Sequence, residues 1–256
     1  MKFFVLSSAL PLATFARSNF NDNKGMISEM ISQAIENQDF LDQLPKSLTD
    51  PNSMSDEELE AAVFDEYEVS DGKQGGRGSG VKHKYNIKKT FMKNLEAYGC
   101  WCTFGENFAG MGIPVDSIDR KCKALNEAYE CANMEVNQCV PWEVEFNLPE
   151  HAFNLATDDA IRSKCIQSNK NKSPCQKTAC MIQVMFVNDL FDALFETGGF
   201  AGRYKHDNRF RPERDCKFHN NKVQVDRQCC GQFPKRKIFN NAMMQCCADG
   251  KSRIVC

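Results

Sequence analysis

The fourteen cysteines of this 256-residue chain are the residues whose spacing says most about chemistry. Their number is even, and a secreted chain can oxidise such a set into disulfides, whereas a cytosolic protein must keep every thiol reduced. Structural zinc is the competing use of clustered cysteines, but zinc sites repeat Cys-x-x-Cys units or combine them with paired histidines. The closest cysteines here do neither, which favours disulfides. These pairs are Cys100/Cys102, Cys229/Cys230 and Cys246/Cys247.

The N-terminus has the pattern of a secretory signal peptide over residues 1–16. Lys2 gives a basic start, residues 3–12 form an apolar run, and Thr14 and Ala16 are small residues at the positions that a signal peptidase reads. A buried N-terminal helix is the alternative. No later segment has the roughly eighteen uninterrupted apolar residues of a membrane span. We therefore expect a secreted, extracellular protein with no transmembrane helix.

Charge is distributed unevenly along the chain, although the net charge is only −2. Residues 18–72 hold 14 acids and 2 bases, residues 73–95 hold 7 bases and no acid, and residues 202–256 hold 13 bases and 5 acids. The basic end favours an anionic phospholipid surface, a sulfated glycan or an extracellular matrix protein as partner, and nucleic acid is not expected. A solvated basic face, neutralised by the acidic N-terminal region, is the alternative.

Composition divides the chain into four segments. The signal peptide, 1–16, precedes an acidic propeptide-like or disordered region, 17–84, which carries apolar residues at near-helical spacing between Met26 and Leu41. Its last residues, 73–84, form a glycine-rich and then basic linker. Cleavage in this linker would release a propeptide, and a disordered extension that is never removed is equally consistent.

The two remaining segments hold all the cysteines. In segment 85–202 we predict one helix that Asp116 caps and that runs to about Asn133, and a second from about Gln176 to Glu196. Segment 203–256 is a basic, cysteine-rich C-terminal module without clear periodicity, and we expect cross-links to order it. The fold class is therefore mainly α.

The motif Tyr98-Gly-Cys-Trp-Cys102, followed by Pro114-Val-Asp-Ser-Ile-Asp-Arg-Lys-Cys122 and Tyr129, resembles secreted phospholipase A2. That family carries Tyr-Gly-Cys-Tyr-Cys-Gly, a calcium loop, and Pro-x-Asp-x-x-Asp-x-Cys-Cys-x-x-His-Asp-x-Cys-Tyr. The resemblance covers roughly residues 89–200. It implies a pair of long antiparallel helices cross-linked by disulfides, with a calcium loop on one side.

The family's chemistry needs a histidine base, an aspartate beside it that holds calcium, and a calcium ion that polarises the ester carbonyl. The ungapped alignment places Leu125 at the histidine, Asn126 at the calcium-binding aspartate, and Gln183 at the carboxylate that orients the histidine. Leucine cannot transfer a proton, and a register shifted by one residue supplies no base either. The histidines of this chain fall outside the motif, and we expect them at the surface. They are His83, His151, His206 and His219.

Calcium is the cofactor that the resemblance implies, at positions that read Trp101, Thr103 and Gly105 together with Asn126. Thr103 replaces a glycine that gives the family's loop its conformational freedom. Asn126 offers a carbonyl oxygen but removes a full negative charge from a site for a hard cation. The sequence therefore predicts a weakened calcium site.

The resemblance also implies disulfide pairings. It suggests Cys102–Cys122, Cys139–Cys175 and Cys165–Cys180, and leaves Cys100 to reach Cys216. Six cysteines stay unassigned, namely Cys131, Cys229, Cys230, Cys246, Cys247 and Cys256.

Two disulfides of the family have lost both of their cysteines. Lys121 and Asp189 stand at the ends of one, and Ala128 and Ile182 stand at the ends of the other. Each pair is predicted to face across the two helices. Leu125 and Gln183 likewise replace the histidine and its orienting partner together, which indicates coordinated change.

Two functions are compatible with these residues. The favoured one is a catalytically inactive, phospholipase A2-like extracellular binding or matrix protein. The alternative is a divergent calcium-dependent phospholipase A2 that hydrolyses phospholipid sn-2 esters with a base from elsewhere in the chain.

Overall fold

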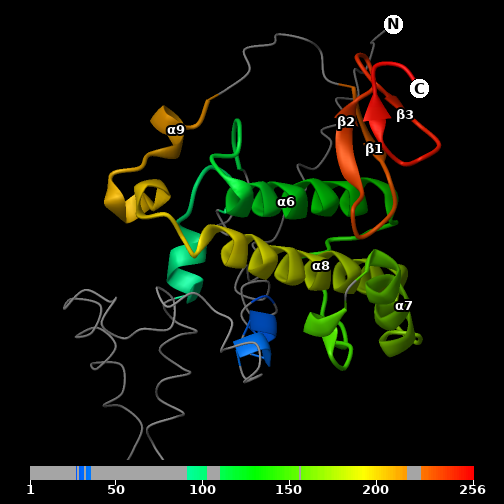
Figure 1. Ribbon diagram of the computed structural model, residues 1–256. Helices are drawn as coiled ribbons and strands as arrows, with labels where there is room; N and C mark the ends of the chain where they lie inside the picture. Colours follow the sequence, from blue (N-terminus) through cyan, green and yellow to red (C-terminus); the bar gives the residue numbers. More distant parts are fainter. Residues whose placement is uncertain are drawn as a thin grey trace, which may run out of the picture.

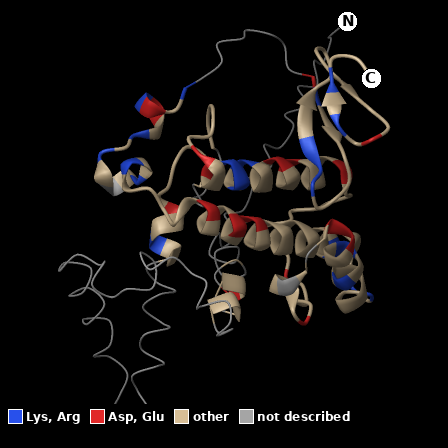
Figure 2. Ribbon diagram, in the orientation of Figure 1, with Lys and Arg blue, Asp and Glu red and all other residues tan. Residues whose placement is uncertain are grey.

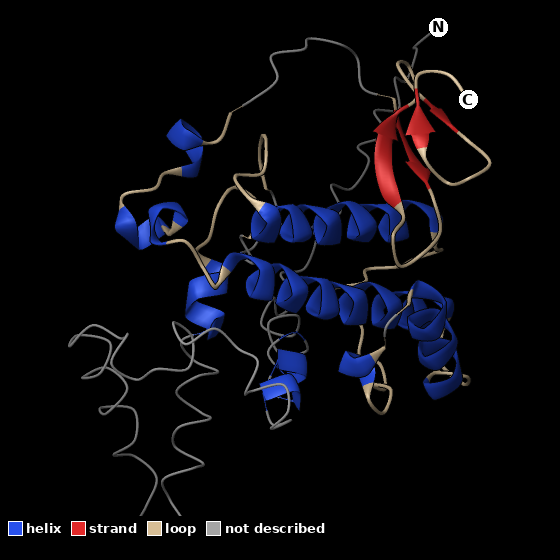
Figure 3. Ribbon diagram, viewed as in Figure 1, coloured by secondary structure: helices blue, strands red, loops and turns tan. Residues whose placement is uncertain are grey.

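Two long helices, α6 (Ser117–Glu135) and α8 (Pro174–Thr197), lie side by side in the computed structural model and run in opposite directions (Figure 1). Secondary structure in the described part of the chain is mainly helical, with short strands near the C-terminus (Figure 3). The predicted mainly α, disulfide-rich class is therefore confirmed. The structure describes residues 27, 29–31, 33–35, 91–102, 110–155, 157–217 and 226–256.

Helix α6 begins where the sequence predicts. The carboxylate of Asp116 accepts a hydrogen bond from the backbone N–H of Asp119 at 2.9 Å, which satisfies a donor that the first turn leaves open. The helix ends two residues beyond the expected Asn133, at Glu135. One face of α6 is buried, and its members are Ile118, Asp119, Cys122, Leu125, Asn126, Ala128, Tyr129, Cys131 and Ala132.

Helix α8 has defined signals at both ends. Ser173 and Gln176 form a reciprocal capping box, with N–H···O distances of 3.2 Å to the Ser173 hydroxyl and 3.0 Å to the Gln176 side chain. Pro174 occupies the first turn, where its missing N–H costs nothing. Gly198 ends the helix with a φ of 72°, a left-handed conformation that glycine adopts without steric penalty.

Helix α8 forms the centre of the core. Residues 178–187 are all buried, so neighbouring elements cover this stretch on every side. Among the described residues α8 is the helix that is long and apolar enough to cross a membrane by length and composition alone. Because 78% of its apolar window is buried inside the protein, its environment is that of a core helix.

Further helical elements pack against this core, and one of them is the helix at residues 91–96, which buries Phe91, Met92 and Leu95. Helix α7 (Asp158–Ser168) and the short helix η2 (Ala152–Asn154) both contact α8. The described residues within 27–35 are helical, and their apolar side chains belong to the same core cluster. This agrees with the near-helical spacing of apolar residues between Met26 and Leu41, and the propeptide-like or disordered character of 17–84 as a whole stays a prediction. The predicted signal peptide, 1–16, and the linker, 73–84, lie outside the described residues.

The C-terminal residues 226–256, called here the hairpin module, form two antiparallel strand pairs that the sequence did not predict. The first pairs β1 (Arg227–Cys230) with β2 (Lys237–Asn240), in a register that places Cys229 opposite Ile238. The second pairs β3 (Gln245–Cys246) with β4 (Ser252–Arg253). Short helices connect α8 to this module. They are η3 (Gly202–Tyr204), η4 (His206–Asn208) and α9 (Pro212–Asp215).

All fourteen cysteines are joined in seven disulfides. Such a density of disulfides is typical of oxidising compartments and suggests a secreted or extracellular protein. The four pairs expected from the resemblance are all formed, including Cys102–Cys122 and Cys100–Cys216. The three pairs left open by the sequence are Cys131–Cys229, Cys230–Cys246 and Cys247–Cys256.

Candidate functional site

The loop before α6 is held by one buried carboxylate, that of Asp119. Its Oδ2 accepts from the backbone N–H of Cys100 at 3.0 Å and of Val115 at 2.9 Å, and its Oδ1 accepts from the N–H of Trp101 at 2.6 Å. Burial raises the pKa of this carboxyl, and the three N–H donors oppose the rise. Gly99 passes so close that a Cβ there would lie 2.5 Å from the Asp119 Cγ. The carboxylate therefore fixes where the loop meets the helix.

The position that the resemblance assigns to the general base is part of the core. Leu125 is only 3% exposed and lies one turn before Tyr129 on the same face of α6. Gln183, at the position of the orienting carboxylate, is fully buried on α8, and its Nε2 donates to the carbonyl of Pro141 at 3.3 Å. An aliphatic side chain and a neutral amide supply no proton transfer near neutral pH.

The hydroxyl of Tyr129 completes this buried group. Burial raises the pKa of this phenol. The aromatic ring lies 5.9 Å from that of Trp142, centroid to centroid. Tyr129 is therefore a packing residue of the core, and its phenol remains neutral at physiological pH.

The described calcium positions do not fit a calcium site. Calcium prefers several oxygen ligands that include carboxylates, whereas Asn126 is a buried neutral amide. The carboxylate of Asp119, which faces the loop from the first turn of α6, is already bonded to three backbone N–H groups. Thr103 and Gly105 lie outside the described residues.

Trp101, the remaining calcium position, is held tightly by its surroundings. Its indole Nε1 donates to the carbonyl of Gly112 at 3.1 Å, and the ammonium of Lys123 lies 5.1 Å from the ring centroid. Gly110 passes directly over the ring, because a Cβ there would come within 2.2 Å of it. Trp101 therefore packs the loop against the start of α6.

Two residue pairs stand at the positions where the resemblance expects disulfides between the helices. Lys121 Nζ lies 3.2 Å from Asp189 Oδ2, and the two side chains are 31% and 25% exposed. Ala128 and Ile182 are 3% and 2% exposed and belong to one core cluster. One of these pairs is thus an ion pair, and the other consists of two buried apolar residues.

The predicted surface histidines differ among themselves. His151 is exposed, whereas His206 is half-buried, with a ring nitrogen 2.8 Å from the carbonyl of Gly99 and its ring stacked on Phe210. His206 is therefore a structural residue of the segment after α8. His83 and His219 lie outside the described residues.

The hairpin module is fastened to the helices by its basic residues. Arg236 forms a two-bond contact with the carboxylate of Glu135, and Arg227 Nη1 lies 2.9 Å from Glu130 Oε2. Figure 2 shows these basic strands beside the acidic C-terminal end of α6. The disulfide Cys131–Cys229 joins the same surfaces covalently. Part of the positive charge of residues 202–256 is thus paired with carboxylates of α6 and is not available to a partner.

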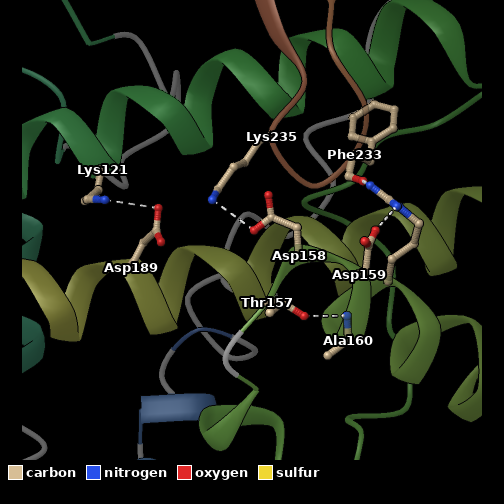
Figure 4. Close-up of polar contacts among 9 residues, drawn as sticks. Lys121, Thr157, Asp158, Asp159, Ala160, Asp189, Phe233 and Lys235 are labelled. Carbon is tan, nitrogen blue, oxygen red and sulfur yellow. Dashed lines mark hydrogen bonds and ion pairs between the residues drawn. The ribbon is translucent and has the colours of Figure 1, made fainter. Parts of the chain in front are cut away.

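Helix α7 makes a second set of contacts with this module (Figure 4). Lys235 Nζ lies 2.9 Å from Asp158 Oδ1, and Arg162 donates two hydrogen bonds, at 3.0 and 2.9 Å, to the carbonyl of Phe233. Arg162 also pairs with Asp159 at 2.6 Å, which orients the guanidinium. These contacts between α7 and the hairpin module are called here the clamp. The sequence carried no local signal for the clamp beyond the opposite charges of the two segments.

Positive charge remains exposed in residues 203–217, called here the basic segment, which contains six Lys or Arg and three acids. The guanidinium of Arg211 donates to the carbonyls of His206 and Phe210, at 2.7 and 3.1 Å. Arg214 pairs with Asp215, and this contact lowers the pKa of Asp215 to about 2. The exposed basic residues of the segment are Arg203, Arg209, Arg211, Arg214 and Lys217.

The site therefore consists of a carboxylate-anchored loop, a buried apolar and amide group where a base would stand, and an arginine-rich segment beside it. No protein-family model matches this chain, and no solved structure matches it.

Proposed function

We propose that this chain is a secreted, phospholipase A2-like protein without hydrolytic activity, which acts as an extracellular binding or matrix protein. The antiparallel pair α6 and α8 supports the family part of the proposal. The four disulfides implied by the resemblance and the ion pair between Lys121 and Asp189 add further support. Seven disulfides support secretion.

The burial of Leu125 is the observation that carries the inactive part of the proposal. Ester hydrolysis by an activated water needs a group that accepts its proton, and general-base assistance is worth about a hundredfold to ten-thousandfold. Leu125 is 3% exposed inside the helix pair, and its neighbour Asn126 offers no charge for a cation. Both the base and the charge that would hold calcium are therefore missing from the same turn of α6.

The basic segment is the surface that we assign to binding. It is anchored to the loop before α6 by the disulfide Cys100–Cys216 and by the hydrogen bond from Ile113 N–H to the Lys217 carbonyl, at 2.9 Å. Arginine side chains on an anchored backbone suit sulfate and phosphate groups, which accept paired hydrogen bonds from a guanidinium.

A sulfated glycan is the partner class that the segment fits best. A membrane-binding surface combines basic residues with apolar side chains that enter the lipid. In the basic segment the aromatic ring of Phe210 is only 7% exposed and Tyr204 is half-buried, so the segment offers mainly charge. Charge without apolar insertion matches a sulfated polysaccharide.

Hydrolysis is tested by fatty-acid release from mixed phosphatidylcholine and phosphatidylglycerol vesicles, with calcium or with chelator. We expect no release above the protein-free background under either condition. Release that requires calcium and persists in Leu125→Ala would overturn the inactive assignment, because a base from elsewhere in the chain would then be at work.

Glycan binding is tested by the salt concentration that elutes the protein from immobilised heparin. The triple variant of Arg203, Arg209 and Lys217 to Gln should elute at clearly lower salt than the unchanged protein. The matched control removes three exposed charges elsewhere, by changing Lys164, Lys170 and Lys172 to Gln, and should elute close to the unchanged protein. Equal losses in both variants would argue against the basic segment. Binding to anionic vesicles without heparin retention would favour a membrane partner.

A further inference from the structure

The helix within residues 27–35 buries a continuous apolar stripe. Its buried positions recur at the spacing i, i+3, i+4, i+7 and i+8, which is one face of an α-helix. These side chains are at most 1% exposed, whereas Glu29 and Gln33 on the other face are exposed. The buried residues are Ile27, Met30, Ile31, Ala34 and Ile35.

The stripe packs against the central part of the fold. Its five residues belong to one core cluster with the apolar residues of α8. Gln33 and residues 148–153 line one cavity of about 330 Å³, which places the helix next to η2. The side chain of Asn188 on α8 donates to the carbonyl of Ala152 at 3.0 Å, so η2 in turn lies on α8. Figure 1 shows the short N-terminal helix on the side of α8 away from α6.

Apolar packing is the contact with the fold that the described residues of this helix show. Short helices are marginal by themselves in water, so the surface that the stripe covers stabilises this one. The first cysteine of the chain is Cys100, so no disulfide ties the helix to the rest of the molecule. Its covalent connection is the backbone of residues 36–90, which includes the basic linker at 73–84.

We propose that α8, η2 and residues 146–153 form a helix-binding groove, and that its occupant is this chain's own segment 27–35. The segment stays bound through apolar contacts and does not need the backbone connection. Cutting the linker therefore yields a two-chain protein with the acidic N-terminal piece retained. Displacement of the segment uncovers the groove for another amphipathic helix of the same spacing. The inference does not depend on the function proposed above.

The experiment uses the secreted full chain with a specific protease site in place of residues 75–80. After folding, purification and complete cutting, the sample is run on size exclusion at micromolar concentration. We expect the N-terminal fragment to co-elute with the disulfide-linked remainder, at the mass of one complete chain. Ile31→Ala should weaken retention by about a hundredfold, because a buried side chain is truncated. Glu29→Ala, on the exposed face of the same helix, should change it by about twofold or less.

A second measurement avoids the question of whether a variant folds. An excess of synthetic peptide 21–40 should displace the fragment from the cut, unchanged protein, and the same peptide with Ile31→Ala should not. Separation of the N-terminal fragment of unchanged sequence from the remainder at micromolar concentration would overturn the proposal. Elution at twice the chain mass would also overturn it, because the segment would then bind a second copy. Equal retention of the Ile31→Ala and Glu29→Ala fragments would show that the stripe is not what holds the segment.

Discussion

Lys121 at the start of α6 and Asp189 late in α8 form an ion pair across the two central helices, with Nζ 3.2 Å from Oδ2. The resemblance to secreted phospholipase A2 places a pair of bonded cysteines at these two positions. Because both side chains are partly exposed, the pair contributes only about 0–1 kcal/mol. The apolar contacts between α6 and α8 therefore supply most of the stability that a covalent bond would have given.

Replacing this ion pair by cysteines tests the alignment directly. The double change Lys121→Cys with Asp189→Cys should close an eighth disulfide, because the resemblance places bonded cysteines here, and bonded cysteines hold their α-carbons about 4.4 to 6.8 Å apart. The added bond should raise the free energy of unfolding by about 2–4 kcal/mol. Peptide mapping under non-reducing conditions and chemical denaturation measure the two effects.

The control for this change is Lys121→Cys with Asp192→Cys, which moves one cysteine to an exposed position of α8. It should leave two free thiols. Two free thiols in the Asp189 variant as well would show that the helices do not present these positions to each other as the family does.

The long helices could be predicted because their signals are local. The Asp116 cap and the spacing of apolar residues fixed α6 to within two residues at its end. The expected start of α8 at Gln176 missed the first turn, which begins with Ser173 and Pro174. Proline is tolerated there because a backbone N–H at that position would have no partner within the helix. Local capping and periodicity thus account for the two elements that form the core.

The hairpin module could not be predicted because its order is not local. The β1 sequence Arg-Gln-Cys-Cys has no apolar alternation, and its pairing depends on the register with β2 and on the bond from Cys229 to Cys131. The helix within 27–35 had visible periodicity, yet its binding surface lies in a distant part of the chain. In the site, the alignment was enough to place Leu125 and Gln183. The three backbone N–H groups that donate to the Asp119 carboxylate could not be predicted, because they depend on the geometry of the loop.

Arg162 should fasten the hairpin module to α7. Arg162→Ala removes two charge-assisted hydrogen bonds to the Phe233 carbonyl. A hydrogen bond to a charged group contributes about 1.5–3 kcal/mol to stability. The disulfide Cys131–Cys229 keeps the module attached, so the effect should be local loosening. Hydrogen exchange of the amides between residues 232 and 238 should become faster.

The control for the Arg162 change is Lys164→Ala, an exposed residue on the same helix. Exchange in the hairpin should then match that of the unchanged protein. Equal protection in the Arg162 variant would mean that the disulfide and the contacts of Arg236 and Lys235 hold the module without the clamp.

Asp215 in α9 should titrate at low pH. The hydrogen bond from the Arg214 guanidinium lowers its pKa from 3.8 to about 2, assisted by the N–H of Arg211. A carboxyl with a lowered folded pKa stabilises the fold above its unfolded pKa, and this contribution is lost as the pH falls through about 2. Titration of the carboxyl carbon by NMR measures the pKa directly.

Arg214→Gln should raise the pKa of Asp215 toward 3.8. Arg211→Gln should move it less, because the backbone N–H that contacts Asp215 remains in that variant. A larger shift with Arg211→Gln would contradict the assignment of Arg214 as the main partner.

Asp119 should be the residue on which the loop before α6 depends most. Asp119→Asn keeps the shape of the side chain but replaces one acceptor oxygen by an NH₂ group, so at least one backbone N–H of the loop loses its partner. A buried donor without a partner costs about 1–3 kcal/mol, and the loss of charge weakens the remaining bonds further. Chemical denaturation should show this loss. Faster hydrogen exchange at the amides of Cys100 and Trp101, with the rest of α6 unchanged, should locate it.

Asp192→Asn, at an exposed carboxylate of α8, should alter stability by no more than about 0.5 kcal/mol. If both variants were equally stable, the disulfides Cys100–Cys216 and Cys102–Cys122 would suffice to hold the loop, and the carboxylate would be dispensable.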